Sequence, residues 1–236
     1  MALPKIQHPL FSVVVPSQKK TIKFRQLTAR EEKILLVAKT SDEDADKLAA
    51  IQQIVNNCVV TENFDINSIT IFDLEYLFLK IRAVSIGNII PVSYRDNADN
   101  QIYEFEINLD TIQVKWPIET PPTINLSDDI KMTMKWPSAE LYSDNKLHTQ
   151  SGIEALEHMI IKSIDKIYTP DQVYDPRDYT TEELVEFISD INSKAYEQIQ
   201  DFFSKMPSME HVITYTNSLG DERKIELKTL SDFFQF

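Results

Sequence analysis

The stretch that decides the fold runs from residue 68 to residue 107 and reads SITIFDLEYLFLKIRAVSIGNIIPVSYRDNADNQIYEFEI. Apolar residues in its first half recur every three or four positions, which places one apolar face on a helix. These residues are Leu74, Leu77, Phe78, Ile81 and Val84. Thr70 and Asp73 have the spacing of a capping box, and Gly87 suits the backbone conformation with which many helices end. The sequence therefore predicts a buried helix between Thr70 and Gly87.

The second half of the same stretch is typical of a β-hairpin. Residues 89–95 and 102–107 are rich in β-branched and aromatic side chains, which favour strands. Residues 96–100 between them read DNADN, and Asp and Asn are turn-forming residues. We therefore expect the helix to lead directly into a hairpin.

A similar unit is expected near the C-terminus. Thr180 and Glu183 again have the spacing of a capping box, and the apolar pattern after them predicts one long helix over residues 180–206. Two β-prone runs, 212–216 and 223–227, predict a second hairpin. Each of the two hairpins leads into the pattern I-x-L-x-T-[I/L]. This likeness fits an internal duplication, and it fits equally the general similarity of strands that lead into helix caps.

The remaining elements complete the predicted architecture. They are strands over 11–15 and 21–25, a helix that begins at the capping box Thr28–Glu31, a helix over about 48–58, a strand over 130–136, and a helix from Ser151 with Ile164 on its apolar face. The proline-rich run 116–122 is typical of a linker. We predict an α+β protein with mostly antiparallel strands, built as two helix-plus-β-hairpin subdomains over residues 1–116 and 123–236.

Composition restricts the class of partner. The chain has 236 residues, of which 24 are basic and 37 acidic, giving a net charge of −13 that repels a phosphate backbone. We therefore expect no nucleic-acid partner. We also find no signal peptide and no apolar run long enough to span a membrane, so we expect no membrane partner and a location in the cytosol or in a particle assembled there.

Residues that carry chemistry are few. Cys58 is the only cysteine and shares an apolar helix face with Ile51 and Val55, which predicts a buried, unreactive thiol and no intramolecular disulfide. His158 belongs to no H-E-x-x-H motif, and the chain has no G-x-S-x-G motif. The loop 168–179 carries three aspartates, but their spacing matches no calcium-binding loop. We therefore predict no catalytic residue, no cofactor and no metal site.

Aromatic residues are the candidate contact residues. Phe233, Phe234 and Phe236 stand within the last four positions, where chain ends are usually polar. They could dock against the second hairpin of the same chain or insert into a partner, since aromatic side chains anchor many interfaces. We add Tyr94 and Tyr103 of the central hairpin as candidate partner-binding residues, and we include a homo-oligomer among the possible assemblies.

Four stretches resemble the baseplate-hub assembly proteins of T4-like contractile-tailed bacteriophages. They are the opening MALPK with PSQKKTIKFRQLTAREEKILLVAK, the block LEYLFLKIRAVSIGN, the strand IKMTMKWP and the closing ERKIELKTLSDFF. Hairpins of related proteins can carry C-x-x-C knuckles, but the corresponding turn at residues 216–220 is TNSLG, so the resemblance implies no metal knuckle in this chain.

The resemblance implies a non-enzymatic role in building the hub at the centre of the tail baseplate. Two versions remain open: a structural hub component that stays in the virion, and a transient assembly chaperone for hub subunits or for the tape-measure protein. The implied partners are other baseplate hub or tail proteins, in the virion tail or in the host cytoplasm during assembly. A third hypothesis, a host-directed hydrolase, would need a convergent catalytic pocket that no motif indicates.

Overall fold

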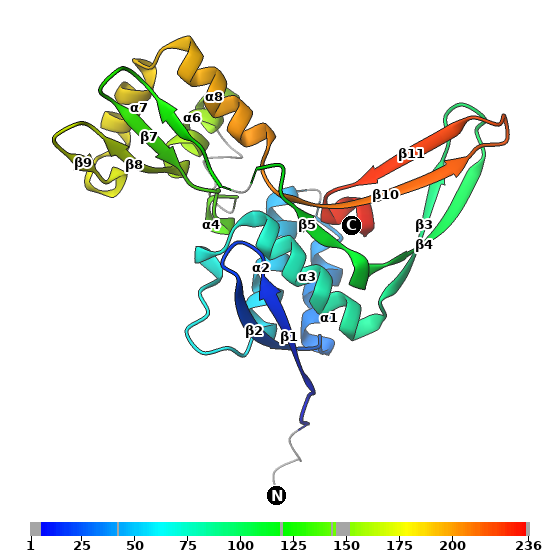
Figure 1. The fold of residues 1–236 in the computed structure, drawn as a ribbon. Coiled ribbons are helices and arrows are strands. Elements are labelled where there is room, and N and C mark those ends of the chain that lie inside the picture. The colour runs from blue at the N-terminus through cyan, green and yellow to red at the C-terminus, as the bar shows by residue number, and fades with distance from the viewer. Residues whose placement is uncertain (1–5, 42, 119, 143, 145–151, 235–236) are drawn as a thin grey trace, which may run out of the picture. The chain divides into compact units, whose positions relative to one another are not determined.

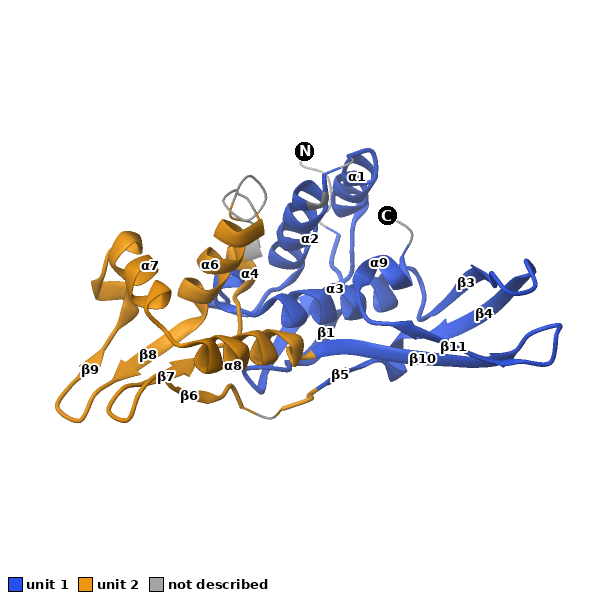
Figure 2. Cartoon of the chain, turned by 90° about the horizontal axis from the view of Figure 1, so that it is seen from above, with its two compact units in different colours: residues 1–115, 208–236 blue, residues 116–207 orange. Residues whose placement is uncertain are grey.

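The computed structural model describes residues 6–41, 43–118, 120–142, 144 and 152–234. The chain forms two compact units, which are coloured separately in Figure 2: unit 1 comprises residues 1–115 and 208–236, and unit 2 comprises residues 116–207. Helices accompany small sheets in which all paired strands are antiparallel, which confirms the predicted α+β class.

Unit 1 is built around helix α3, Ile71–Ile86, as the sequence predicts. The Thr70 hydroxyl accepts a hydrogen bond from the Asp73 N–H, while the Asp73 carboxylate accepts one from the Thr70 N–H, so both halves of the capping box are present. The helix ends at Gly87, whose φ of 144° is in the region that favours glycine. Helix α3 is buried on more than the one predicted face, since Phe72, Tyr76 and Leu79 are also buried.

The N-terminal part of unit 1 covers α3. Strands β1 (Leu10–Val15) and β2 (Lys20–Arg25) form the predicted hairpin, followed by α1 (Ala29–Ala38) and α2 (Asp44–Cys58) and the 3₁₀ helix η1 (Ile66–Ser68). Both β1 and α2 contact α3. The turn of the β1–β2 hairpin is attached through Ser17, whose N–H and hydroxyl both donate to the Asp73 carboxylate. The buried Asp73 therefore caps α3 and also anchors the turn of the β1–β2 hairpin.

Two hairpins from distant parts of the sequence lie side by side in unit 1 (Figures 1 and 2). The first consists of β3 (Ile89–Arg95) and β4 (Ile102–Asn108), followed by η2 (Leu109–Thr111) and β5 (Gln113–Lys115). The second consists of β10 (Ser208–Thr216) and β11 (Glu222–Leu227), followed by α9 (Leu230–Phe233). We call these two hairpins together the arm.

The division of the chain differs from the predicted one at its C-terminal end. The sequence predicts a subdomain over 123–236, whereas residues 208–236 belong to unit 1. The physical reason is strand pairing: Ser208, Met209 and Glu210 of β10 pair with β5, and β10 also contacts α3. Unit 2 is therefore an insertion between two neighbouring strands of unit 1.

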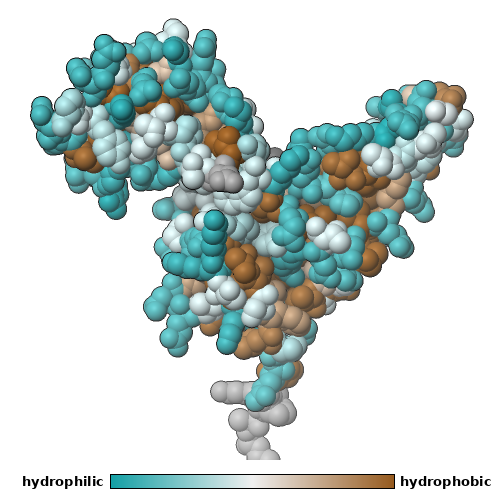
Figure 3. Space-filling view, viewed as in Figure 1, coloured by the Kyte–Doolittle hydropathy of each residue, from teal (hydrophilic) through white to brown (hydrophobic). Residues whose placement is uncertain are grey.

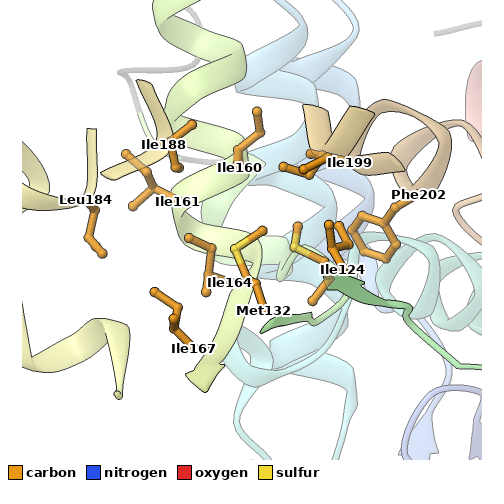
Figure 4. Close-up of a cluster of buried hydrophobic side chains, with 12 residues drawn as sticks. Ile124, Met132, Ile160, Ile161, Ile164, Ile167, Leu184, Ile188, Ile199 and Phe202 are labelled. Carbon is orange, nitrogen blue, oxygen red and sulfur yellow. The ribbon is translucent and has the colours of Figure 1, made fainter. Parts of the chain in front are cut away.

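Unit 2 contains a four-stranded sheet in the order β6 (Thr123–Asn125), β7 (Lys131–Met134), β8 (Ile164–Tyr168), β9 (Val173–Tyr174). Its helices are α4 (Ala139–Tyr142), α6 (Gly152–Ser163), η3 (Pro176–Asp178), α7 (Thr181–Ser189) and α8 (Ser193–Ser204). Figure 4 shows its core, in which Met132 and Ile164 of the sheet meet Ile160, Ile199 and Phe202 of the helices.

Two predictions for unit 2 are wrong. The single helix over 180–206 is two helices, because Asn192 caps α8: its side-chain oxygen accepts from the Ala195 N–H, and its side-chain nitrogen donates to the Leu126 carbonyl. Ile164 belongs to strand β8 and not to the preceding helix, since it pairs with Met134 of β7. Both errors arise where a partner distant in sequence competes with helix continuation.

The Asp73 anchor yields a stability prediction. Asp73→Ala removes four hydrogen bonds at a fully buried carboxylate and should lower the free energy of unfolding by about 3 kcal/mol. The matched control is Glu183→Ala, which removes the same capping box at the exposed start of α7 and should cost clearly less, because water can solvate the groups that it leaves. Urea unfolding followed by circular dichroism measures both values, and equal losses would show that Asp73 acts only as a cap.

Candidate functional site

An ion pair between a buried carboxylate and a partly exposed arginine joins the two hairpins of the arm. Asp96, in the turn after β3, is fully buried, and its carboxylate accepts from Arg223 Nε at 3.1 Å and Arg223 Nη2 at 3.2 Å. It also accepts from the Tyr215 hydroxyl at 2.8 Å and from the Ala98 N–H within its own turn. The Ala98 N–H, the Tyr215 hydroxyl and the Arg223 charge hold the pKa of Asp96 below its ordinary value. Asp96 is therefore an ionised bridge between β3 and the β10–β11 hairpin.

A second carboxylate bridges the turns of the same two hairpins. Asp99 Oδ2 accepts from the Ser218 N–H at 2.9 Å, from the Ser218 hydroxyl at 2.8 Å and from the Tyr103 hydroxyl at 2.6 Å. Burial disfavours the charged form of Asp99, but the bonds from Tyr103, Gln101 and Ser218 outweigh it and keep the pKa of Asp99 low. The carboxylates of Asp96 and Asp99 therefore join the two hairpins of the arm near their turns.

Aromatic rings fill the space between the hairpins. The Tyr215 ring centroid lies 4.7 Å from that of Tyr103, 5.3 Å from that of Phe105 and 6.4 Å from that of Tyr94. Such tilted and edge-on pairs are favourable arrangements of aromatic side chains. Burial, followed by the neighbouring Asp96 charge, raises the pKa of Tyr215 to about 12, so its hydroxyl stays a hydrogen-bond donor.

A groove of about 560 Å³ lies in unit 1 beside the base of the arm. Its walls come from α1, α3, β3 and α9, and two of its apolar lining residues, Leu36 and Ile86, are exposed by 63% and 55%. In Figure 3, hydrophobic side chains interrupt the hydrophilic surface on the face of unit 1 that is shown. Exposed apolar residues gathered in a concave surface are typical of protein-binding sites.

The groove also has a cationic wall. The Arg82 guanidinium lies 5.7 Å from the centre of the Phe234 ring, and burial lowers the pKa of Arg82, with Glu32 opposing the shift. Arg82 Nη1 is buried and has no hydrogen-bond partner among the described residues. A buried donor without a partner is costly, so this nitrogen is a locally destabilising feature of the groove wall.

The candidate aromatic residues occupy different environments. Phe233 is buried within the chain, and Phe234 packs edge-on against Phe78 of α3 with ring centroids 6.1 Å apart. Phe236 lies outside the described residues. Tyr94 is 36% exposed on the arm, and Tyr103 is half-buried between the hairpins. The structure therefore brings Phe233 and Phe234 together at the groove, and Tyr94 and Tyr103 together in the arm.

The residues that join the two hairpins of the arm were not predicted from the sequence. Asp96 and Arg223 are 127 positions apart, and neither belongs to a motif. Tyr215 had one signal, because Val92-Ser93-Tyr94 and Ile213-Thr214-Tyr215 occupy matching places in the two hairpins. That likeness indicates equivalent strands, but it does not say that the strands face each other.

The side chains that could act in catalysis or metal binding are held in structural contacts. Burial raises the pKa of the Cys58 thiol to about 11, so the sulfur is protonated and unreactive, as predicted. His158 Nε2 lies 2.9 Å from Asp144 Oδ2. Among the residues that the structure describes, no three His, Cys, Asp or Glu side chains gather as metal ligands. Over the same described ranges, no helix is both long and apolar enough to cross a bilayer.

Residues 8–235 match the family described as T4 bacteriophage base plate protein, and the chain belongs to that family. It is therefore a structural protein of the phage tail baseplate, which contacts other tail or baseplate proteins. Comparison with curated proteins and with solved structures gave no match.

The Asp96 bridge predicts how the arm responds to mutation. Asp96→Ala leaves Arg223 without its carboxylate and should raise amide hydrogen exchange at least tenfold in both hairpins, while α3 keeps its protection. Asp221→Ala, an exposed aspartate in the turn of the second hairpin, is the control and should change exchange only locally. Unchanged exchange in β3 and β4 of the Asp96 variant would contradict the bridge.

A second prediction concerns pH. Burial raises the pKa of Glu75 on α3 from 4.5 to about 7, although its carboxylate accepts from the backbone N–H of Leu230 in α9. The folded state therefore binds this proton more tightly than the unfolded chain, and ionisation between about pH 4.5 and pH 7 lowers stability as pH rises. We expect Glu75→Gln to raise the free energy of unfolding by about 2–3 kcal/mol at pH 8 and to leave it nearly unchanged at pH 4.5.

Thermal and urea unfolding of both proteins across this pH range measure the difference. Glu31 provides an internal check at acid pH, because the Arg25 and Thr28 hydrogen bonds outweigh its burial and lower its pKa to about 2. Its contribution is lost as pH falls below 4.5 and is the same in both proteins. A Glu75→Gln effect that does not depend on pH would disprove the titration.

Proposed function

We propose that this protein is a component of baseplate hub assembly and that it acts through the arm and the groove as contact surfaces. The observation that supports this most directly is the bridging of two hairpins by Asp96. The ion pair of the buried Asp96 with the partly exposed Arg223 adds little net stability, because burying the carboxylate is costly. Its effect is to hold two hairpins in one arrangement, and a fixed arrangement lowers the entropy lost when a partner binds.

The groove would supply the apolar part of the contact. Leu36 and Ile86 are exposed there, and Arg82 also lines the groove. Phe234 lines the groove wall, and Tyr94 is a partly exposed aromatic residue on the arm. Other hub or tail proteins are the proposed partners, with the tape-measure protein as one candidate and a second copy of this chain as another.

A second role remains as an alternative: a transient chaperone for hub subunits or for the tape-measure protein, present in the host cytoplasm during assembly. The net charge of −13 suits both roles, since an acidic surface can shield basic surfaces of a partner before assembly. The two roles differ in whether the chain stays in the virion.

Quantitative mass spectrometry of purified virions and of baseplate assembly intermediates tests both roles. Stoichiometric copies in virions support a structural hub component. Copies in intermediates but not in virions support the transient chaperone. Absence from both would contradict the proposal.

A variant tests the surface. Leu36→Asp combined with Ile86→Asp should reduce incorporation into intermediates at least tenfold, because charge in an apolar interface is poorly solvated. Ile153→Asp is the control, since Ile153 of α6 is 74% exposed in unit 2. All variants should keep the parental melting temperature within a few degrees. Equal incorporation of the two variants would exclude the groove as the contact surface.

A further inference from the structure

Unit 2 carries a groove of its own, separate from the site in unit 1. Its volume is about 380 Å³, and its apolar lining residues are Ile130, Ile167, Tyr174, Tyr179, Leu184 and Phe187. Ile167 and Leu184 also belong to the core of unit 2, and Figure 4 shows both at the end of that core away from Phe202. The groove is therefore the place where the hydrophobic core of unit 2 reaches the surface.

The loop beside this groove has a fixed conformation. The Asp175 carboxylate accepts from Arg177 Nε and Nη2 and from the Arg177 N–H, and it is also paired with Lys166. The rings of Tyr174 and Tyr179 pack with centroids 6.3 Å apart. Tyr179 nevertheless remains 40% exposed, so one wall of the groove is both ordered and accessible. A preformed apolar surface loses little entropy on binding.

The surroundings of the groove are acidic. Glu182, Glu183 and Glu186 are exposed on α7, and Glu183 lines the groove itself. The nearby cations Lys166 and Arg177 are both paired with Asp175. Unit 2 as a whole has 17 acidic and 8 basic residues, so its net charge of −9 is most of the −13 of the chain. A ligand of this groove must therefore tolerate, or be attracted by, negative charge.

We propose that this groove binds a segment of another protein in which large apolar side chains are flanked by lysine or arginine. The apolar side chains would cover Tyr179, Leu184 and Phe187, and the flanking cations would lie near Glu182 and Glu186. Electrostatic attraction of this kind raises the association rate and selects against acidic segments. The same charge disfavours nucleic acid and a second copy of unit 2. The proposal does not depend on the hub assignment, because it concerns another surface.

Fluorescence anisotropy with the full-length protein tests the proposal. The probe is a labelled synthetic peptide with a Leu-Phe pair flanked on each side by two lysines. One comparison peptide replaces the Leu-Phe pair with Ser-Ser, and another replaces the lysines with glutamates. We expect the first peptide to bind at least tenfold more tightly than either comparison peptide, and its affinity should fall as salt concentration rises.

Matched variants locate the binding. Tyr179→Ser, and separately Glu182→Gln combined with Glu186→Gln, should each weaken binding about threefold to tenfold. The control is Glu140→Gln combined with Glu197→Gln, which removes the same charge from exposed positions on α4 and α8 and should leave affinity unchanged.

Three outcomes would overturn the proposal. Equal binding of the Leu-Phe and Ser-Ser peptides would mean attraction to negative charge without use of the groove. An equal loss of peptide affinity in the Glu182/Glu186 variant and in the Glu140/Glu197 control would also mean attraction to negative charge without use of the groove. Concentration-dependent dimerisation that Tyr179→Ser abolishes, measured by sedimentation, would assign the groove to a second copy of this chain.

Discussion

The burial of helix α3 is the constraint on which the rest of unit 1 depends. Its side chains are apolar on several faces, so a single covering layer cannot remove them all from water. The β1–β2 hairpin, α2, β5 and β10 all contact it, and they come from both ends of unit 1. This requirement explains why residues 208–236 return to unit 1 after the whole of unit 2. Asp73 makes the arrangement specific, because one carboxylate satisfies both the helix start and the turn at Ser17.

The two hairpins of the arm are held together by polar and aromatic contacts near their turns. The arm extends beyond the elements that cover α3, and Asp96, Asp99 and the Tyr215 cluster join its two hairpins near their turns. Two-stranded hairpins are only marginally stable alone, so such cross-links determine whether the arm has one conformation. A baseplate protein must fit between neighbours, and fixed surfaces serve that task. The two grooves differ: the one in unit 1 is lined by the cation of Arg82, whereas the one in unit 2 is apolar and surrounded by carboxylates.

Local signals account for much of the fold. The capping boxes at Thr28, Thr70 and Thr180 each begin a helix as predicted, because the groups involved lie within four residues of each other. Both hairpins of the arm were also predicted, since strand propensity and turn residues are local. The break at Asn192 and the start of β8 at Ile164 were missed, since each depends on a partner more than twenty residues away.

The sequence by itself determined the α+β class, the helix that unit 1 surrounds and the family resemblance, all of which rest on periodicity, caps and contiguous motifs. Tertiary structure alone decided that unit 2 is an insertion, that Phe234 packs on α3, and that Asp96 meets Arg223 across 127 positions. The physical reason is that long-range pairing is selected by the burial and charge of the whole fold, and no short stretch of one chain records its distant partner.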